Sequence, residues 1–133
     1  MSKKIIFSVW SDLSPSWIEH KTALVDKHKE YAKACGADYE LIDTNQNFID
    51  LMFFKIQLAE ELLDKYDQAL YLDLDVIPLT SKSFFDTFNL DKICLHHTLN
   101  PKWKIQQKRL MLAEDGIISD NKITNTGVFG INK

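Results

Sequence analysis

Two aspartates one residue apart, Asp73 and Asp75, are the side chains of this sequence best suited to chemistry. They stand in residues 68–78 (QALYLDLDVIP), a run whose apolar first half predicts a buried strand. Positions two apart on a strand share a face, so we expect both carboxylates on one side, roughly 6–7 Å apart along the chain. Such a pair favours a divalent cation that prefers oxygen ligands, magnesium or manganese, with phosphate oxygens completing its shell. A solvated turn is the alternative, because an Asp-x-Asp pair alone is a weak motif.

A lysine is predicted close to the two aspartates. The pattern predicts a helix over residues 48–65, whose polar residues occupy one narrow arc opposite a broad apolar face. Lys55 interrupts that apolar face, where an ammonium group is costly unless it reaches solvent or a negative partner. In a strand–helix–strand unit the helix begins at the carboxyl edge of the sheet, so Lys55 should lie near Asp73 and Asp75. It either pairs with a carboxylate or holds a phosphate that also binds the metal.

The elements that would position these residues predict an α/β fold, a Rossmann-like and mostly parallel sheet flanked by helices. Strands are expected over residues 4–10, 38–43, 68–78, 92–97 and 122–133, and helices over residues 15–35, 48–65 and 81–88. Ser14 and Pro15 are suited to begin the first helix, and Gly36 to end it. Pro78 lacks an N–H group and should end the third strand. Ligands of such sheets bind at the carboxyl ends of the strands.

The histidines and one basic run offer fewer chemical possibilities. We expect His20 and His28 on the surface, because neither lies close to a cluster of acidic residues in the sequence. His96 and His97 are neighbours on a predicted strand, so they point to opposite faces and do not easily share one ion. The basic residues 101–109 (PKWKIQQKR) form either a solvated surface or a flap that closes over an anionic ligand.

Length and composition exclude several classes of protein. A chain of 133 residues forms one domain with a real core, but not two. Its net charge of −3 argues against a dedicated nucleic-acid binder. No apolar run reaches about 18 residues, so we expect no transmembrane segment. Cys35 and Cys94 lie far apart and predict free thiols in a reducing compartment, and hence a cytoplasmic protein.

Taken in order, these motifs resemble the GT-A class of nucleotide-sugar glycosyltransferases, particularly the glycogenin and lipopolysaccharide galactosyltransferase type. Lys55 stands in the helix before the acidic strand, and residues 71–75 (YLDLD) are similar to the YLDxD signature of that class. Residues 125–129 (NTGVF) are similar to its Asn-Ser/Thr-Gly-Val strand, and residues 7–12 (FSVWSD) to the segment that lines the nucleotide base. The resemblance extends over nearly the whole chain.

The resemblance implies a glycosyltransferase that moves a sugar from a nucleotide-diphosphate sugar, with a UDP-sugar favoured, to an acceptor. Asp73 and Asp75 would bind the manganese or magnesium ion that bridges the diphosphate, and Asp73 would also lie near the ribose. Lys55 would contact the phosphate or the donor sugar. Asn125 and Gly127 would line the sugar pocket, since glycine permits close backbone approach and asparagine offers both a donor and an acceptor. The residues against the nucleotide would be Ser8, Trp10 and Ser11.

Members of that class are longer, and the part after the Asn-x-Gly strand supplies acceptor contacts and a further metal ligand. We therefore expect residues 1–133 to form a single nucleotide-sugar-binding domain whose acceptor part lies in further chain or in a second subunit, as in a homo-oligomer. Two alternatives stay open. A non-catalytic domain would bind the nucleotide sugar without turnover. A haloacid-dehalogenase-type phosphatase also carries Asp-x-Asp after a strand, but usually after the first strand, whereas this pair follows the third.

Overall fold

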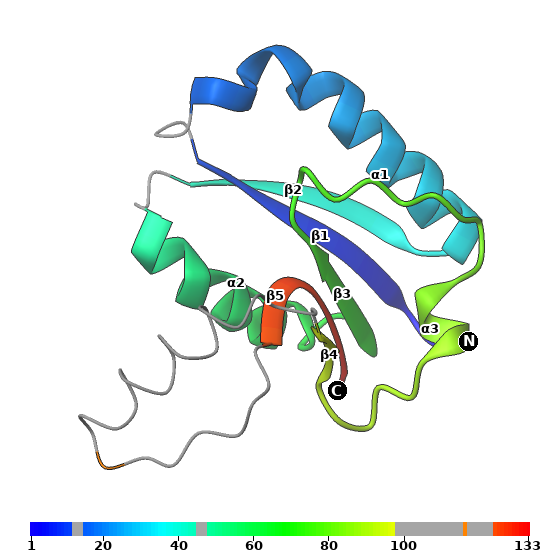
Figure 1. Cartoon of the computed structure of the whole chain (residues 1–133). Helices are drawn as coiled ribbons and strands as arrows, with labels where there is room; N and C mark the ends of the chain where they lie inside the picture. The colour runs from blue at the N-terminus through cyan, green and yellow to red at the C-terminus, as the bar shows by residue number, and fades with distance from the viewer. Residues whose placement is uncertain (12–14, 45–47, 98–115, 117–123) are drawn as a thin grey trace.

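A five-stranded sheet forms the centre of the molecule (Figure 1). The computed structural model describes residues 1–11, 15–44, 48–97, 116 and 124–133, with only the backbone described for residues 15–17, 48–52, 95–97 and 124–126. The strand order is β2-β1-β3-β5-β4. The strands are β1 (Lys4–Ser11), β2 (Asp38–Thr44), β3 (Gln68–Leu72), β4 (Cys94–His97) and β5 (Thr124–Asn132). β1 pairs in parallel with β2 and β3, whereas β5 is antiparallel to both β3 and β4. The expected α/β fold with a mostly parallel sheet is confirmed.

Helices cover the two faces of this sheet. The helices are η1 (Pro15–His20, a 3₁₀ helix), α1 (Lys21–Cys35), α2 (Phe48–Leu62) and the short α3 (Phe84–Thr87). In Figure 1, α1 lies above the sheet and α2 below it. Gly36 ends α1 as expected, with a left-handed φ of 63° and its N–H group directed at the carbonyls of Ala32 and Lys33. In the part of the chain that the structure describes, no helix combines the length and apolar composition needed to cross a membrane.

Side-chain alternation along the central strands divides the core between the two faces. Ile6 and Leu70 pack with Tyr31 and other α1 residues on one side. Phe7 and Tyr71 pack with α2 residues and Phe129 on the other. Because successive strand residues point to opposite faces, each polar residue on these strands is assigned to one helix or the other by its position. Even-numbered positions of β1 therefore face α1, and Tyr71 of β3 faces α2.

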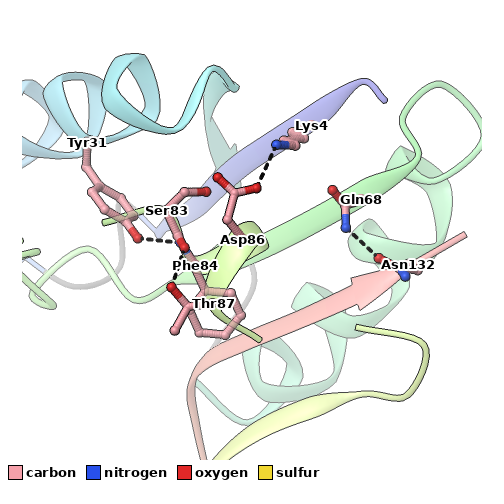
Figure 2. A network of polar contacts seen from close by, with 8 residues as sticks. All are labelled: Lys4, Tyr31, Gln68, Ser83, Phe84, Asp86, Thr87 and Asn132. Carbon is pink, nitrogen blue, oxygen red and sulfur yellow. Dashed lines mark hydrogen bonds and ion pairs between the residues drawn. The ribbon is translucent and has the colours of Figure 1, made fainter. Parts of the chain in front are cut away.

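The amino-end edge of the sheet is closed by the segment around α3, as Figure 2 shows. The Tyr31 hydroxyl donates to the Lys82 carbonyl at 3.0 Å and accepts the Phe84 N–H at 3.1 Å. Lys4 pairs with Asp86, with 3.5 Å between the ammonium nitrogen and a carboxylate oxygen (Figure 2). Gly130 of β5 leaves room for this segment, because a Cβ atom there would lie 2.7 Å from the Phe84 ring. These contacts lie at the amino-end edge, whereas Asp73 and Asp75 follow the carboxyl end of β3.

Several boundaries differ from the sequence prediction, and two of them concern the helix that carries Lys55 and the strand that precedes the aspartates. The helix expected over residues 48–65 ends at Leu62, after which backbone bonds from Lys65 and Tyr66 to the Leu62 carbonyl close a turn. The strand expected over residues 68–78 ends at Leu72. Cys35 is buried and Cys94 partly buried, and both thiols are free, as expected.

Candidate functional site

The two aspartates lie in a tight turn directly after β3, not on the strand itself. The Val76 N–H donates to the Asp73 carbonyl at 2.9 Å, and the Asp73 N–H donates to the Gly127 carbonyl at 2.7 Å. The chain turns here because Leu74 is buried with Trp10 and Leu24 on the α1 side. The expectation that strand alternation sets both carboxylates on one face is therefore wrong. Strand alternation correctly places the Asp73 side chain on the α2 face, where it contacts Tyr71. The position of Asp75 is set by the turn instead.

Lys55 reaches this turn from α2. Only 6% of the residue is exposed, and its ammonium nitrogen lies 3.6 Å from a carboxylate oxygen of Asp73. The same nitrogen lies 4.6 Å from the centre of the Tyr71 ring, a cation–π arrangement. The Tyr71 hydroxyl donates a short hydrogen bond to the Asp73 oxygen that faces Lys55. The lysine that interrupts the apolar face thus meets one of the two aspartates, as predicted.

The electrostatics of this cluster follow from the burial of Lys55 and Tyr71 beside the Asp73 carboxylate. Burial lowers the pKa of Lys55 below its usual value of 10.5, and the Asp73 carboxylate opposes that shift by attracting the charged form. Burial, and then the charge and hydrogen bonding of Asp73, raise the pKa of Tyr71 far above its usual value of 10.0. Tyr71 therefore stays a neutral donor at physiological pH. The Asp73 side chain is 41% exposed, so it stays in contact with solvent beside the buried cation.

A second polar contact reaches the turn from the other face of the sheet. His28 of α1 is completely buried, so its expected surface position is wrong. Its Nε2 atom lies 2.6 Å from the Val76 carbonyl oxygen, and its Nδ1 atom lies 2.9 Å from the Ser8 hydroxyl on β1. A carbonyl can only accept, so Nε2 carries the proton, and the Ser8 hydroxyl donates to Nδ1 of the neutral ring. Burial favours this neutral form by lowering the pKa of His28, whereas the Val76 carbonyl and Asp75 favour the charged form.

The first strand brings its three candidate residues to the same edge, but buries them. Ser8 has no exposed surface, so its hydroxyl serves His28 and has no area left for a direct ligand contact. Trp10 and Ser11 are 5% and 4% exposed. The Trp10 ring packs with Leu74, and the ammonium group of Lys21 lies over the ring, 5.0 Å from its centre. Trp10 therefore links the end of β1 to the aspartate turn.

The start of β5 approaches the turn through its backbone. Gly127 is buried and accepts the Asp73 N–H, so it lies directly beside the aspartates. Asn125 pairs with His96 of β4 in the sheet register, and the ladder between the two strands is irregular at Leu95 and His96. The bend expected at residues 125–127 coincides with this irregularity. The side chain of Asn125 and the basic run 101–109 fall outside the described part of the structure.

A divalent cation fits the chemistry of the two aspartates but needs further ligands. Asp73 and Asp75 supply hard carboxylate oxygens, the type that manganese and magnesium prefer. Among the described residues, no group of three or more His, Cys, Asp or Glu side chains is close enough to hold a metal alone. A cation here would take its remaining ligands from outside this group of described residues, and diphosphate oxygens are of the type that it prefers. An apolar hollow of about 350 Å³ between α2 and β5 contains neither aspartate and does not belong to this site.

Two residues that contact the candidate site, Tyr71 and His28, were not identified from the sequence. In each case the spacing of residues in the sequence could have indicated the contact. Tyr71 counts as apolar in a hydrophobic run, yet it stands two residues before Asp73 and so shares its face. His28 follows Leu24 by four residues and precedes Tyr31 by three, which places it on the buried stripe of α1. Helical spacing was thus a better guide to His28 than its distance in sequence from acidic residues.

Comparison with known proteins agrees with this architecture. One solved structure with the same fold is described as a glycosyltransferase involved in the glycosylation of the major capsid of PBCV-1. The two share 20% sequence identity with a TM-score of 0.61, and the alignment covers 98% of this chain and 60% of that one. A search of curated protein sequences finds no match. The family profile described as glycosyl transferase family 8 matches residues 10–132. The chain belongs to glycosyl transferase family 8.

Proposed function

We propose that this chain binds a nucleotide-diphosphate sugar, with a UDP-sugar favoured, and transfers its sugar with the help of manganese or magnesium. The observation that carries the proposal is the joint position of a buried lysine and an Asp-x-Asp turn at the carboxyl edge of the sheet. Lys55 lies 3.6 Å from Asp73, and Asp75 is exposed on the same turn. Family membership supports glycosyl transfer as the reaction class.

Each residue of the cluster has a role in this proposal. Asp73 and Asp75 hold the cation, and Lys55 contacts the phosphate or the donor sugar. When bound, the cation neutralises the negative charge that develops on the leaving diphosphate. Tyr71 fixes the orientation of the Asp73 carboxylate through its hydrogen bond. Lys55 is preorganised by burial, so its charge acts in a site of low dielectric constant, where it is most effective.

The remaining contacts follow from position. Trp10 and Ser11 end β1 beside the turn and are proposed to border the nucleotide, while Ser8 acts through His28. Gly127 and Asn125 are proposed to border the sugar, because the Gly127 backbone already touches Asp73. The acceptor is proposed to bind beyond residues 1–133, in further chain or a second subunit. The two free cysteines favour a cytoplasmic location.

Thermal unfolding with uridine diphosphate, with and without manganese, tests the metal–diphosphate site. A ligand that binds only the folded chain raises the melting temperature by mass action. We expect a shift that needs both components, and its loss in Asp75→Asn, which removes one metal ligand without changing shape. An equal shift without manganese, or an unchanged one in Asp75→Asn, would contradict the metal assignment.

Binding without turnover is the second candidate function. This chain spans 60% of the length of the structurally similar glycosyltransferase, so the activity of a whole enzyme does not transfer to it directly. Incubation with UDP-glucose or UDP-galactose and manganese separates the two candidates. Release of uridine diphosphate indicates transfer or hydrolysis, whereas a manganese-dependent thermal shift without release indicates a binding domain.

A further inference from the structure

His28 connects the centre of the sheet to the aspartate turn, and nothing in the proposed reaction uses it directly. Its two ring nitrogens contact Ser8 on β1 and the Val76 carbonyl at the end of the turn. The Tyr39 hydroxyl lies 3.4 Å from Nδ1, and its ring packs edge-on against the imidazole. A completely buried imidazole with partners on both nitrogens has one fixed orientation. His28 is therefore a rigid link rather than a mobile base.

Within the described residues, the backbone of the turn is held at three points. Its start is joined to β5 by the bond from Asp73 to Gly127, and its middle is closed by the bond from Val76 to Asp73. The third point is the Val76 carbonyl, a backbone group that is held by the His28 side chain of α1. Asp75 lies inside the turn that the bond from Val76 to Asp73 closes, one residue before Val76, and its carboxylate makes no hydrogen bond or ion pair within the described residues. The backbone of the turn therefore decides where the Asp75 carboxylate points.

We propose that His28, oriented by Ser8, is a positioning residue that sets Asp75 relative to Asp73 for joint binding of the metal and the diphosphate. The inference rests on the proposed function of the two aspartates. Residues that orient metal ligands typically change affinity about 10–100-fold when they are replaced. Without the bond to Val76, Asp75 occupies a wider range of positions, and less of the binding free energy of the cation is realised.

A purely structural role for His28 would lower stability but leave the manganese requirement of binding unchanged in the folded protein. The informative quantity is thus the ratio of uridine diphosphate affinities with and without manganese, measured by calorimetry well below the melting temperature. His28→Phe keeps a ring but loses both polar atoms. His28→Gln keeps an N–H donor for the Val76 carbonyl and an acceptor for Ser8.

Tyr31→Phe is the matched control. Tyr31 lies on α1 one turn after His28 and also holds a distant segment by two hydrogen bonds, but that segment is the α3 region at the other edge of the sheet (Figure 2). We expect His28→Phe to lower the manganese-dependent ratio about 10-fold or more, and His28→Gln to restore most of it. Tyr31→Phe should lower the melting temperature and leave the ratio at the wild-type value.

Amide hydrogen exchange supplies a readout that needs no ligand. His28→Phe should speed exchange at the N–H groups of Asp73 and Val76, while Tyr31→Phe should not. A wild-type chain that binds with manganese, together with an unchanged ratio in His28→Phe, would overturn this inference and leave the proposed function intact. A wild-type chain without manganese-dependent binding would overturn both. If His28→Phe does not fold, the ratio and the exchange rates of His28→Gln decide, and in that case values matching those of Tyr31→Phe would contradict a positioning role.

Discussion

Replacing Lys55 by methionine separates a binding role of the lysine from a structural one. Lys55 is almost fully buried against Tyr71, and its ammonium group meets one oxygen of Asp73 at 3.6 Å. Methionine has a similar length and fills the same space without a charge. Two opposing terms decide the effect on stability. The mutation removes the cost of burying the ammonium group, and it removes the attraction to Asp73.

The exposure of Asp73 to solvent limits its attraction to Lys55, and so limits the stability that is lost with that attraction. Removing one partner of a fully buried ion pair costs about 3–5 kcal/mol, because the other charge is left without compensation. The Asp73 side chain, however, is 41% exposed and keeps its hydrogen bond from Tyr71. The pair is therefore closer to a surface ion pair, worth about 0–1 kcal/mol. We expect Lys55→Met to change the free energy of unfolding by less than about 1 kcal/mol, or to increase it.

Binding should respond much more strongly than stability. A charge-assisted hydrogen bond to a phosphate contributes about 1.5–3 kcal/mol, which corresponds to roughly 10–150-fold in affinity. Urea unfolding measures the free energy of unfolding, and calorimetric titration with uridine diphosphate and manganese measures the affinity for the diphosphate. Lys4→Met is the control, since Lys4 also combines an aspartate partner, Asp86, with an aromatic ring, Phe85, but at the opposite edge of the sheet (Figure 2). It should leave the affinity unchanged.

The pH dependence of stability adds a check on the same variant. The folded chain holds the proton of Lys55 less tightly than the unfolded chain, so the unfolded state binds more protons just below pH 10.5. Stability contributed through Lys55 therefore rises with pH in that window, and Lys55→Met should lose this rise. A loss of more than about 3 kcal/mol at neutral pH, with unchanged affinity for the diphosphate, would refute the reasoning and identify a structural ion pair.

Three further predictions concern the surroundings of the site. Tyr71→Phe keeps the ring stacked on Phe129 but removes the hydrogen bond to Asp73, so calorimetry should show a several-fold weaker manganese-dependent affinity, and an unchanged one would exclude an orienting role. Burial lowers the pKa of His28 below 6.5, so stability should fall as the pH decreases through that value, by at most about 1.4 kcal/mol per pH unit. In His28→Gln, the free energy of unfolding measured in urea should not show this fall below pH 6.5. The same pH dependence in the variant and the wild type would contradict the assignment to His28. Gly130→Ala places a Cβ atom 2.7 Å from Phe84 and should cost about 1–3 kcal/mol in urea unfolding, whereas no loss would show that the ring moves aside freely.

The sequence allowed the parallel part of the fold to be predicted, because its signals are local. Apolar runs indicate β1 and β3, and Gly36 marks the end of α1 by its tolerance of a positive φ. The insertion of β5 between β3 and β4 has no local signal, since it depends on pairing between segments far apart in the chain. The early end of β3 is likewise a tertiary effect. Leu74 continues the apolar run in sequence, but its burial beside Trp10 draws the chain out of the sheet.

Lys55 and His28 show why one buried polar residue was found in the sequence and the other was not. Both interrupt the apolar face of a helix that packs on the sheet, Lys55 on α2 and His28 on α1. Burying an ammonium group without a partner costs much free energy, so a lysine on the apolar face of a helix by itself indicates a negative partner. A neutral imidazole is tolerated there once both nitrogens are bonded, so the same pattern carries less information.

Lys55 and His28 both contact the turn from Asp73 to Val76, Lys55 through a carboxylate and His28 through a carbonyl. If the turn binds a metal–diphosphate, replacements on the two faces should differ in kind. Loss of Lys55 removes an attractive charge and weakens diphosphate binding with or without metal, whereas loss of His28 acts mainly on the metal-dependent part.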